Sequence, residues 1–232
     1  MFKLFKLYSV MMCFLLLSGG CKKETCQEPE FNAQSLRAAA KPFNFKMDTK
    51  AWYRISPTTP ATVPGIPGQL SFENIAGAGA GHSSHIGNVS LWFNQLAYSP
   101  DGQNPPSGSI AAPVTATVNY PALGAPLPYI QPNDFAGFAT IITWLQIPET
   151  MNGYIINNVI YNQHADALFL SATTTSTSVE SATRINFTGD GIIVGGRGKY
   201  ENATGTYHFT GFFNPQDAFD ARFSVDGTVS TN

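Results

Sequence analysis

Charged residues are scarce in this sequence, and basic residues are the scarcest over most of its length. Asp, Glu, Lys and Arg make up 12% of the 232 residues, about half of their share in an average globular protein. After Lys50 the basic residues are few and do not cluster: Arg54, Arg184, Arg197, Lys199 and Arg222. Because nucleic-acid binding needs a dense basic surface, this composition predicts no nucleic-acid partner.

Cysteine is missing from the part of the chain that would form a folded domain. Cys13, Cys21 and Cys26 all lie near the N-terminus, which excludes a disulfide framework, a cysteine metal site and a cysteine nucleophile beyond them. The G-x-S-x-G and Walker A motifs are also absent. Residues 77–81 (GAGAG) lack the third glycine of a dinucleotide-binding motif and are interpreted as a flexible turn. We therefore expect no cofactor.

The first twenty residues have the layout of an export signal. Lys3 and Lys6 precede an apolar stretch from Leu7 to Leu17, and residues 18–20 (SGG) lead directly into Cys21. The stretch is shorter than the ~20 apolar residues that span a bilayer. It resembles the lipobox of bacterial lipoproteins, which implies cleavage before Cys21 and lipid attachment to that cysteine. The alternative is an ordinary secretory signal followed by a chance cysteine.

The lipobox resemblance divides the chain into three parts. Residues 1–20 are the predicted signal peptide, 21–41 the lipidated N-terminus with a flexible tether, and 42–232 the folded domain. A flexible tether of about 20 residues has a root-mean-square span of about 25 Å. The lipid on Cys21 would anchor the domain to a membrane of the bacterial cell envelope. In enterobacterial lipoproteins an Asp after the lipidated cysteine is associated with inner-membrane retention, so Lys22 favours the outer membrane by resemblance.

From residue 43 onward, apolar and polar residues alternate as they do in strands with one buried face. Apolar runs at 139–145, 154–161 and 167–170 also have strand length, and no amphipathic helix is predicted after residue 42. Many strands without helices predict an all-β domain, either a barrel or a sandwich. The clearest alternating positions are Phe43, Phe45 and Met47; Ile185 and Phe187; Tyr207, Phe209 and Phe213; and Phe219, Ala221, Phe223 and Val225.

Glycine and proline mark the predicted turns. Residues 64–68, 100–108 and 189–191 have turn or loop composition. The segment 99–138 contains eight prolines and one strand-like stretch at Val114–Tyr120. It is interpreted either as a functional loop or as a poorly packed insertion.

Two segments carry a resemblance to a known family. Gly81–Gly87 (GHSSHIG) resembles the G-x-[AS]-[ST]-H-[LI]-G segment of small bacterial β-barrel proteins. Ile192–Gly211 (IIVGGRGKYENATGTYHFTG) resembles a glycine-rich hairpin shared by those proteins, the plant allene oxide cyclases and the dirigent proteins. Gln163–Leu170 is similar to a further family stretch, but has Ala165 where glycine is expected. The resemblance implies a single antiparallel eight-stranded barrel, lipocalin-like in outline; a β-sandwich is the alternative.

The glycines of the hairpin have predicted roles of their own. Gly195, Gly196 and Gly198 are expected to permit a positive φ at a tight reversal between strands. Gly205 and Gly211 are expected to relieve crowding where a strand bends to close the barrel.

Histidine supplies the candidate bases near neutral pH, at His82, His85, His164 and His208. His82 and His85 would point to opposite faces of a strand, so no metal site is predicted. His85 occupies a family-like position. It is a weak ligand-binding candidate at a barrel mouth, with a turn anchored by hydrogen bonds as the simpler interpretation. Three acidic residues could form an acid–base pair, but the sequence does not show which of them meet: Glu73, Asp190 and Glu201.

Three functions remain open at this stage. The first is a non-enzymatic, membrane-anchored barrel that binds a small apolar ligand or a partner. The second, by fold analogy alone, is a cyclase-like or isomerase-like enzyme acting on a small apolar substrate in a closed cavity. The third is a structural or adhesive module that forms oligomers through an outer face carrying His208, Thr210 and Phe212.

Overall fold

The computed structural model describes residues 42–55, 59–61, 70–99, 108–119, 135 and 137–231. The predicted signal, the tether and Cys21 lie outside these residues. None of the helices in the described part of the chain combines the length and hydropathy needed to cross a bilayer.

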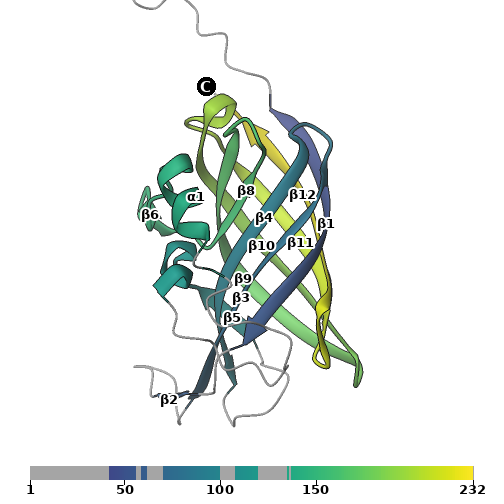
Figure 1. Cartoon of the computed structure of the whole chain (residues 1–232). Coiled ribbons are helices and arrows are strands. Elements are labelled where there is room, and N and C mark those ends of the chain that lie inside the picture. The colour runs from purple at the N-terminus through teal and green to yellow at the C-terminus, as the bar shows by residue number, and fades with distance from the viewer. Residues whose placement is uncertain are drawn as a thin grey trace, which may run out of the picture. The chain divides into compact units, whose positions relative to one another are not determined.

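Long antiparallel strands dominate the described part of the chain (Figure 1). The helical elements are short: the 3-10 helices η1 (Val114–Asn119) and η2 (Gly198–Tyr200), and the α-helix α1 (Phe138–Leu145). The strands are β1 (Phe43–Ile55), β2 (Thr59–Ala61), β3 (Leu70–Ser83), β4 (Gly87–Ser99), β5 (Gly108–Ala111), β6 (Thr150–Met151), β7 (Tyr154–Ile155), β8 (Asn158–Tyr161), β9 (Ala167–Ser181), β10 (Arg184–Arg197), β11 (Thr204–Asn214) and β12 (Asp217–Ser230).

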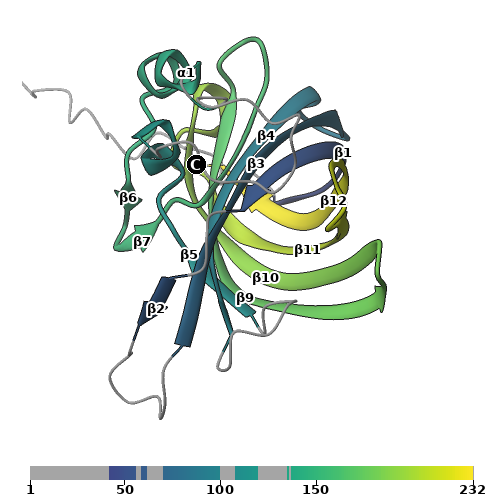
Figure 2. The same cartoon turned by 60° about the horizontal axis from the view of Figure 1, so that its bottom comes forward.

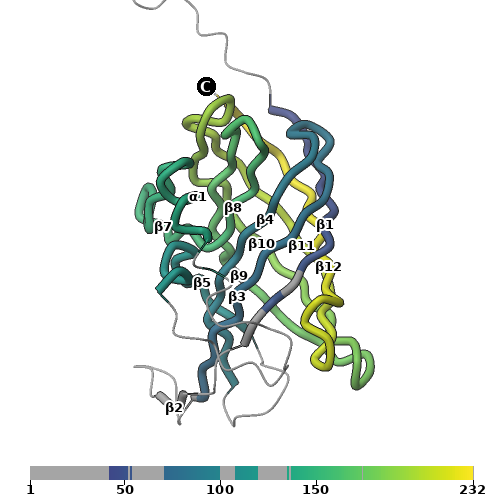
Figure 3. The backbone as a smooth tube through the Cα atoms, in the orientation of Figure 1, coloured from purple at the N-terminus to yellow at the C-terminus, as the bar shows by residue number. Residues whose placement is uncertain are grey.

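The main sheet closes on itself into an eight-stranded barrel, which confirms the predicted fold class and not the sandwich (Figures 2 and 3). Around the barrel the order is β3, β1, β12, β11, β10 and β9, and β4 then returns to β3. Two short strands share the place between β9 and β4. β8 pairs with β4 over Ser90–Phe93, and β5 pairs with β4 over Gln95–Tyr98. Closure removes the free sheet edges that would otherwise invite aggregation.

Alternating side chains fill the interior of the barrel. Phe45 and Phe209 are 1% exposed and Phe223 is 4% exposed, which confirms the period-two pattern of β1, β11 and β12. Phe219 is an exception, because it is 50% exposed while its neighbour Ala218 is buried. The β11–β12 ladder shifts register between Phe213 and Asn214, close to this hairpin, and a register shift reverses which residues face the core.

A second apolar core lies outside the barrel, where α1 and η1 pack against the wall. Trp92 of β4 is fully buried there, and its ring centroid lies 4.5 Å from that of Phe138 of α1. Leu91 and Phe93, on either side of Trp92, belong to the interior core. Both faces of this part of the wall are therefore buried, which explains runs of consecutive apolar residues without alternation.

Two segments predicted as strands are helical. Residues 139–145 belong to α1, and most of Val114–Tyr120 forms η1. The first error also overturns the expectation that no helix follows residue 42. A short and largely apolar segment has no distinctive period, so its pattern cannot separate a buried strand from a short helix.

Two segments predicted as turns are parts of strands. Residues 77–81 lie within β3 and 189–191 within β10. Glycine is required there by close packing. A Cβ on Gly81 would collide with the carbonyl oxygen of Asp48 on β1, and a Cβ on Gly191 would overlap the ring of Tyr207.

The glycines of the family-like hairpin have mixed outcomes. Gly198 has φ +65° at the reversal after β10, as predicted. Gly195 and Gly196 lie within β10 and do not have a positive φ. A Cβ on Gly205 would collide with the Thr228 carbonyl oxygen, and one on Gly211 with the Arg222 carbonyl oxygen. Both glycines therefore relieve crowding against a neighbouring strand, as predicted.

Candidate functional site

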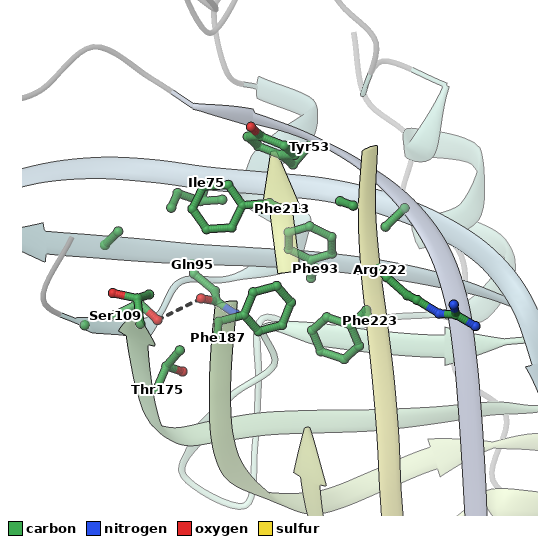
Figure 4. Close-up of a pocket in the computed structure, with 15 residues that line it drawn as sticks. Tyr53, Ile75, Phe93, Gln95, Ser109, Thr175, Phe187, Phe213, Arg222 and Phe223 are labelled. Carbon is green, nitrogen blue, oxygen red and sulfur yellow. Dashed lines mark hydrogen bonds between the residues drawn. The ribbon is translucent and has the colours of Figure 1, made fainter. Parts of the chain in front are cut away.

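One end of the barrel holds a small apolar pocket of about 60 Å³, here called the mouth pocket. Aromatic rings from five strands gather around it (Figure 4). Small residues leave the space between them: Ala51, Ala97, Gly108 and Ala221. The aromatic lining residues are Tyr53 (β1), Phe93 (β4), Phe187 (β10), Phe213 (β11) and Phe223 (β12).

The rings pack against one another as well as around the pocket. The centroids of Phe187 and Phe223 lie 5.6 Å apart, and those of Tyr53 and Phe213 lie 5.3 Å apart with the rings edge to face. The rings of Phe209 and Phe223 are stacked and nearly parallel, with their centroids 5.4 Å apart. Such pairs add roughly 0.5–1.5 kcal/mol each beyond the area that they bury. The aromatic walls are therefore fixed by their mutual packing.

The Phe187 ring reaches this position because Gly211 faces it. A Cβ on Gly211 would overlap the Phe187 ring, so the absence of a side chain on β11 lets the ring lie across the interior. Gly211 lies between Phe209 and Phe213 on the interior face of β11. The local sequence Phe-Thr-Gly-Phe-Phe thus gives β11 two interior rings with a gap for a third.

Neutral polar groups line one side of the mouth pocket. The hydroxyl of Ser109 on β5 donates a hydrogen bond of 2.7 Å to Oε1 of Gln95 (Figure 4). Thr175 and Thr177 of β9 also contribute to the lining. The Arg222 guanidinium points away from the rings (Figure 4) and donates from Nε to Asp48 Oδ1 at 2.8 Å. The pocket therefore offers apolar contacts and hydrogen bonds to an uncharged group.

A carboxyl group lies beside this end of the barrel. Glu73 of β3 is directly opposite Ala97 of β4 in the ladder, and opposite residues share a face. Since Ala97 lines the mouth pocket, the half-buried Glu73 shares that interior face. Burial raises the pKa of the Glu73 carboxyl. Asp190 lies elsewhere, paired with His208, and Glu201 follows η2, so the structure does not join these three acids into one site.

His85 lies far from the mouth pocket. It is exposed in the turn between β3 and β4, with its ring centroid 4.6 Å from that of Phe43 at the start of β1. Tyr53 of the pocket is ten residues further along the same strand, about 33 Å away. The Tyr200 hydroxyl donates to the carbonyl oxygen of His85 at 3.4 Å. The structure thus places His85 at the opposite end of the barrel from the pocket.

The other three histidines are exposed. A ring nitrogen of His82 lies 3.3 Å from Asn88 Oδ1, and one of His164 lies 3.3 Å from Gln163 Nε2. Within the described ranges, no three His, Cys, Asp or Glu side chains come together as a possible metal site.

His208 contacts Asp190 Oδ1 at 2.9 Å through Nδ1 and Thr188 Oγ1 at 3.3 Å through Nε2. This Asp–His–Thr order is that of a nucleophilic triad. However, the side chains of His208 and Asp190 are 45% and 68% exposed. Electrostatic catalysis of this kind depends on a water-excluded site, so we assign no catalytic role to the group.

Comparison with protein-family models, curated proteins and solved structures finds no match for this chain. The functional argument therefore rests on the geometry of the barrel.

Most of the pocket residues could not be selected from the sequence. Phe187, Phe213 and Phe223 were predicted to face the interior, since each lies in an alternating run. Gln95 and Ser109 carry no motif, and their hydrogen bond joins β4 to β5 across a proline-rich segment. Their partnership depends on the pairing of β4 with β5, which no motif in the sequence predicts.

Proposed function

We propose that this protein is a lipid-anchored protein of the bacterial cell envelope whose barrel binds a small uncharged apolar group without changing it chemically. The mouth pocket carries the proposal, because aromatic rings and neutral hydrogen-bonding groups form its lining. The lipobox-like segment ending at Cys21 supports the anchor, with the outer membrane as its expected location.

The size of the pocket limits what it can hold. Its volume of about 60 Å³ is several times the ~10–15 Å³ that one water molecule needs. It is well below the ~300–1,000 Å³ of pockets that enclose a drug-sized ligand. The pocket therefore suits the end of an alkyl chain or part of a ring that belongs to a larger molecule.

The enzyme alternative has less support. A cyclase or isomerase of the barrel type would need a chamber around its substrate, whereas packed side chains fill most of this interior. Buried polar groups do occur deeper in the barrel, where Asn158 Nδ2 lies 3.4 Å from the Tyr207 hydroxyl. The Phe209 ring packs between Tyr207 and Phe223 of the pocket, 5.9 Å from the ring of Tyr207 and 5.4 Å from that of Phe223. The polar pair is thus separated from the pocket.

The third alternative, a structural module that forms oligomers, would use Phe212 as a contact residue on its outer face. The guanidinium carbon of Arg184 lies 3.8 Å from the centroid of the Phe212 ring and covers one of its faces. The ring therefore already has an intramolecular partner.

Native mass spectrometry of the mature protein, before and after extraction with organic solvent, tests the binding proposal. We expect an excess mass that extraction removes. The variant Ala221→Leu, which fills the pocket, should lose this mass. The matched variant Ala80→Leu changes an exposed residue of β3 and should keep it. A bare mass in the gently purified protein, or an excess mass unaffected by Ala221→Leu, would contradict binding in the mouth pocket.

A further inference from the structure

Five large apolar side chains are exposed in the described part of the chain, and three of them belong to elements on one side of the barrel. Ile110 on β5, Trp144 on α1 and Tyr154 on β7 are 53%, 40% and 47% exposed. In Figures 1 and 2 alike, β5, α1 and the β6–β7 hairpin lie on the same side. Scattered exposed apolar residues are ordinary in soluble proteins, whereas exposed aromatic residues on elements of the same side are typical of a contact surface.

Buried apolar contacts hold α1 against the barrel wall. The helix is fixed by Leu145, which is 1% exposed, and by Phe138, which packs on Trp92. Trp144 contacts the ring of Tyr161 on β8 edge to face at 6.3 Å and is 40% exposed. One part of its ring therefore packs on the wall, and another part meets solvent.

The outer face of α1 is unusually free of groups that require water. Its first turn has no acidic residue and its last turn no basic residue. Thr140 Oγ1 donates to the Gly137 carbonyl oxygen at 2.7 Å, and Thr143 Oγ1 donates to the Ala139 carbonyl oxygen at 3.2 Å. Both exposed hydroxyls are thus satisfied by the backbone, which lowers the penalty for removing them from water.

The surrounding sequence is almost uncharged. Between residues 135 and 161 the only charged residue is Glu149, and no Lys or Arg occurs between Arg54 and Arg184. A nucleic acid or an acidic protein would require basic groups here. In space, Arg197 and Glu201 adjoin Leu145 of α1 and the β6–β7 hairpin. The surface therefore carries charges of both signs and is close to neutral.

We propose that α1 and the β6–β7 hairpin form a face that rests on the lipid bilayer, with Trp144 and Tyr154 at the level of the headgroups. Trp and Tyr favour this interface because one part of each ring is apolar and another is polar.

The inference rests on the proposed lipid anchor. With about 20 residues between Cys21 and β1, the tether would hold the domain at a root-mean-square distance of about 25 Å from its anchor. A face that prefers the interface would then settle on it at little additional entropic penalty.

The near-neutral charge of this face, where Arg197 lies near Glu201, gives the contact a distinct signature. Electrostatic docking on anionic lipids weakens with salt. The contact proposed here uses apolar and aromatic groups, so it should be the same on phosphatidylcholine alone and in 0.5 M NaCl.

Trp144 is a natural reporter for the test. The lipidated full chain is placed in phosphatidylcholine vesicles, with or without bromine atoms near the top of the acyl chains, which quench nearby tryptophan. We expect bromine to lower the emission by up to about one third, because Trp144 is one of three tryptophans. The Trp144→Phe variant, which keeps Trp52 and Trp92, should show no such loss.

A second pair of variants leaves the reporter in place. Thr140→Asp with Thr143→Asp adds charge to the exposed face of α1 and should abolish the quenching. Ser176→Asp with Ser178→Asp adds the same charge to exposed positions of β9 and should retain it. Circular dichroism checks that both variants are folded.

The outcomes separate this contact from the anchor. If the protein floats with the vesicles but its tryptophan emission is the same with and without bromine, the contact is overturned and the anchor is left intact. Protein that fails to float overturns both. Self-association that Thr140→Asp with Thr143→Asp abolishes, without any quenching, would show that a second copy covers this face and would also overturn the proposal.

Discussion

Replacing Ala165 with glycine should leave the protein at least as stable, although it removes a half-buried methyl group. Ala165 has φ +63°, a left-handed conformation that costs an L-residue about 1–2 kcal/mol relative to its preferred region. Glycine at this position would lower the stability by about 0.5–1 kcal/mol, because the unfolded chain has more conformational freedom to lose on folding. Loss of half a buried methyl removes about 0.4 kcal/mol more. With the middle value of each range, Ala165→Gly should raise the free energy of unfolding by about 0.4 kcal/mol.

Ala203→Gly is the matched control. Ala203 is fully buried and does not have a positive φ, so glycine there relieves no strain. Added chain freedom and the lost methyl should together cost about 1.5 kcal/mol. The two variants should therefore differ by about 2 kcal/mol, or about 4–8 °C in Tm for a domain of this size. Urea unfolding followed by tryptophan fluorescence measures the difference. Equal destabilisation by both substitutions would refute the reasoning.

Three further substitutions and one control substitution test the electrostatics and the packing. Burial raises the pKa of Asp166, but hydrogen bonds from the Lys199 backbone N–H and the Asn162 amide, together with the Lys199 ammonium, outweigh it and leave the pKa below its usual value. Its stabilisation is therefore present above about pH 4 and is lost as the pH falls through the folded-state pKa. Asp166→Asn should cost about 1–3 kcal/mol at pH 7 and less at pH 3, measured from urea midpoints. Glu73→Gln should stabilise the protein at pH 7 and have no effect at pH 3, because the folded state disfavours the carboxylate. Gly211→Ala should cost about 1–3 kcal/mol by displacing Phe187. Gly137→Ala, where a Cβ has open space, should change the stability by less than about 0.5 kcal/mol.

The barrel was predictable because its strands bury one face at a time. Phe45 and Met47 of β1, or Phe223 and Val225 of β12, repeat at the period of a strand and are buried as expected. The outer core lacks that signal. In α1 the sequence FATIITWL is apolar at nearly every position, and its choice between helix and strand depends on contacts with Trp92 and η1 that lie far away in the sequence.

The same limit applies to glycine and to the candidate site. Gly191 has the composition of a turn, yet it lies within a strand because the Tyr207 ring needs its space. The mouth pocket joins residues separated by up to 172 positions, from Ala51 to Phe223. Local propensity contains no information about such neighbours. The sequence therefore suggested His85 as a ligand-binding candidate but could not predict the mouth pocket.

The shared place between β4 and β9 makes the barrel wall uneven. β9 forms thirteen residue pairs with β10, but four with β8 and one, Gly108 with Ser176, with β5. Opening free energy follows the local network of contacts, so amide hydrogens along this seam should exchange with solvent before those of the β9–β10 ladder. Gly108, Ser109 and Thr175 form both the seam and one wall of the mouth pocket. Opening of the seam would therefore enlarge the pocket, and an occupant would slow hydrogen exchange there first.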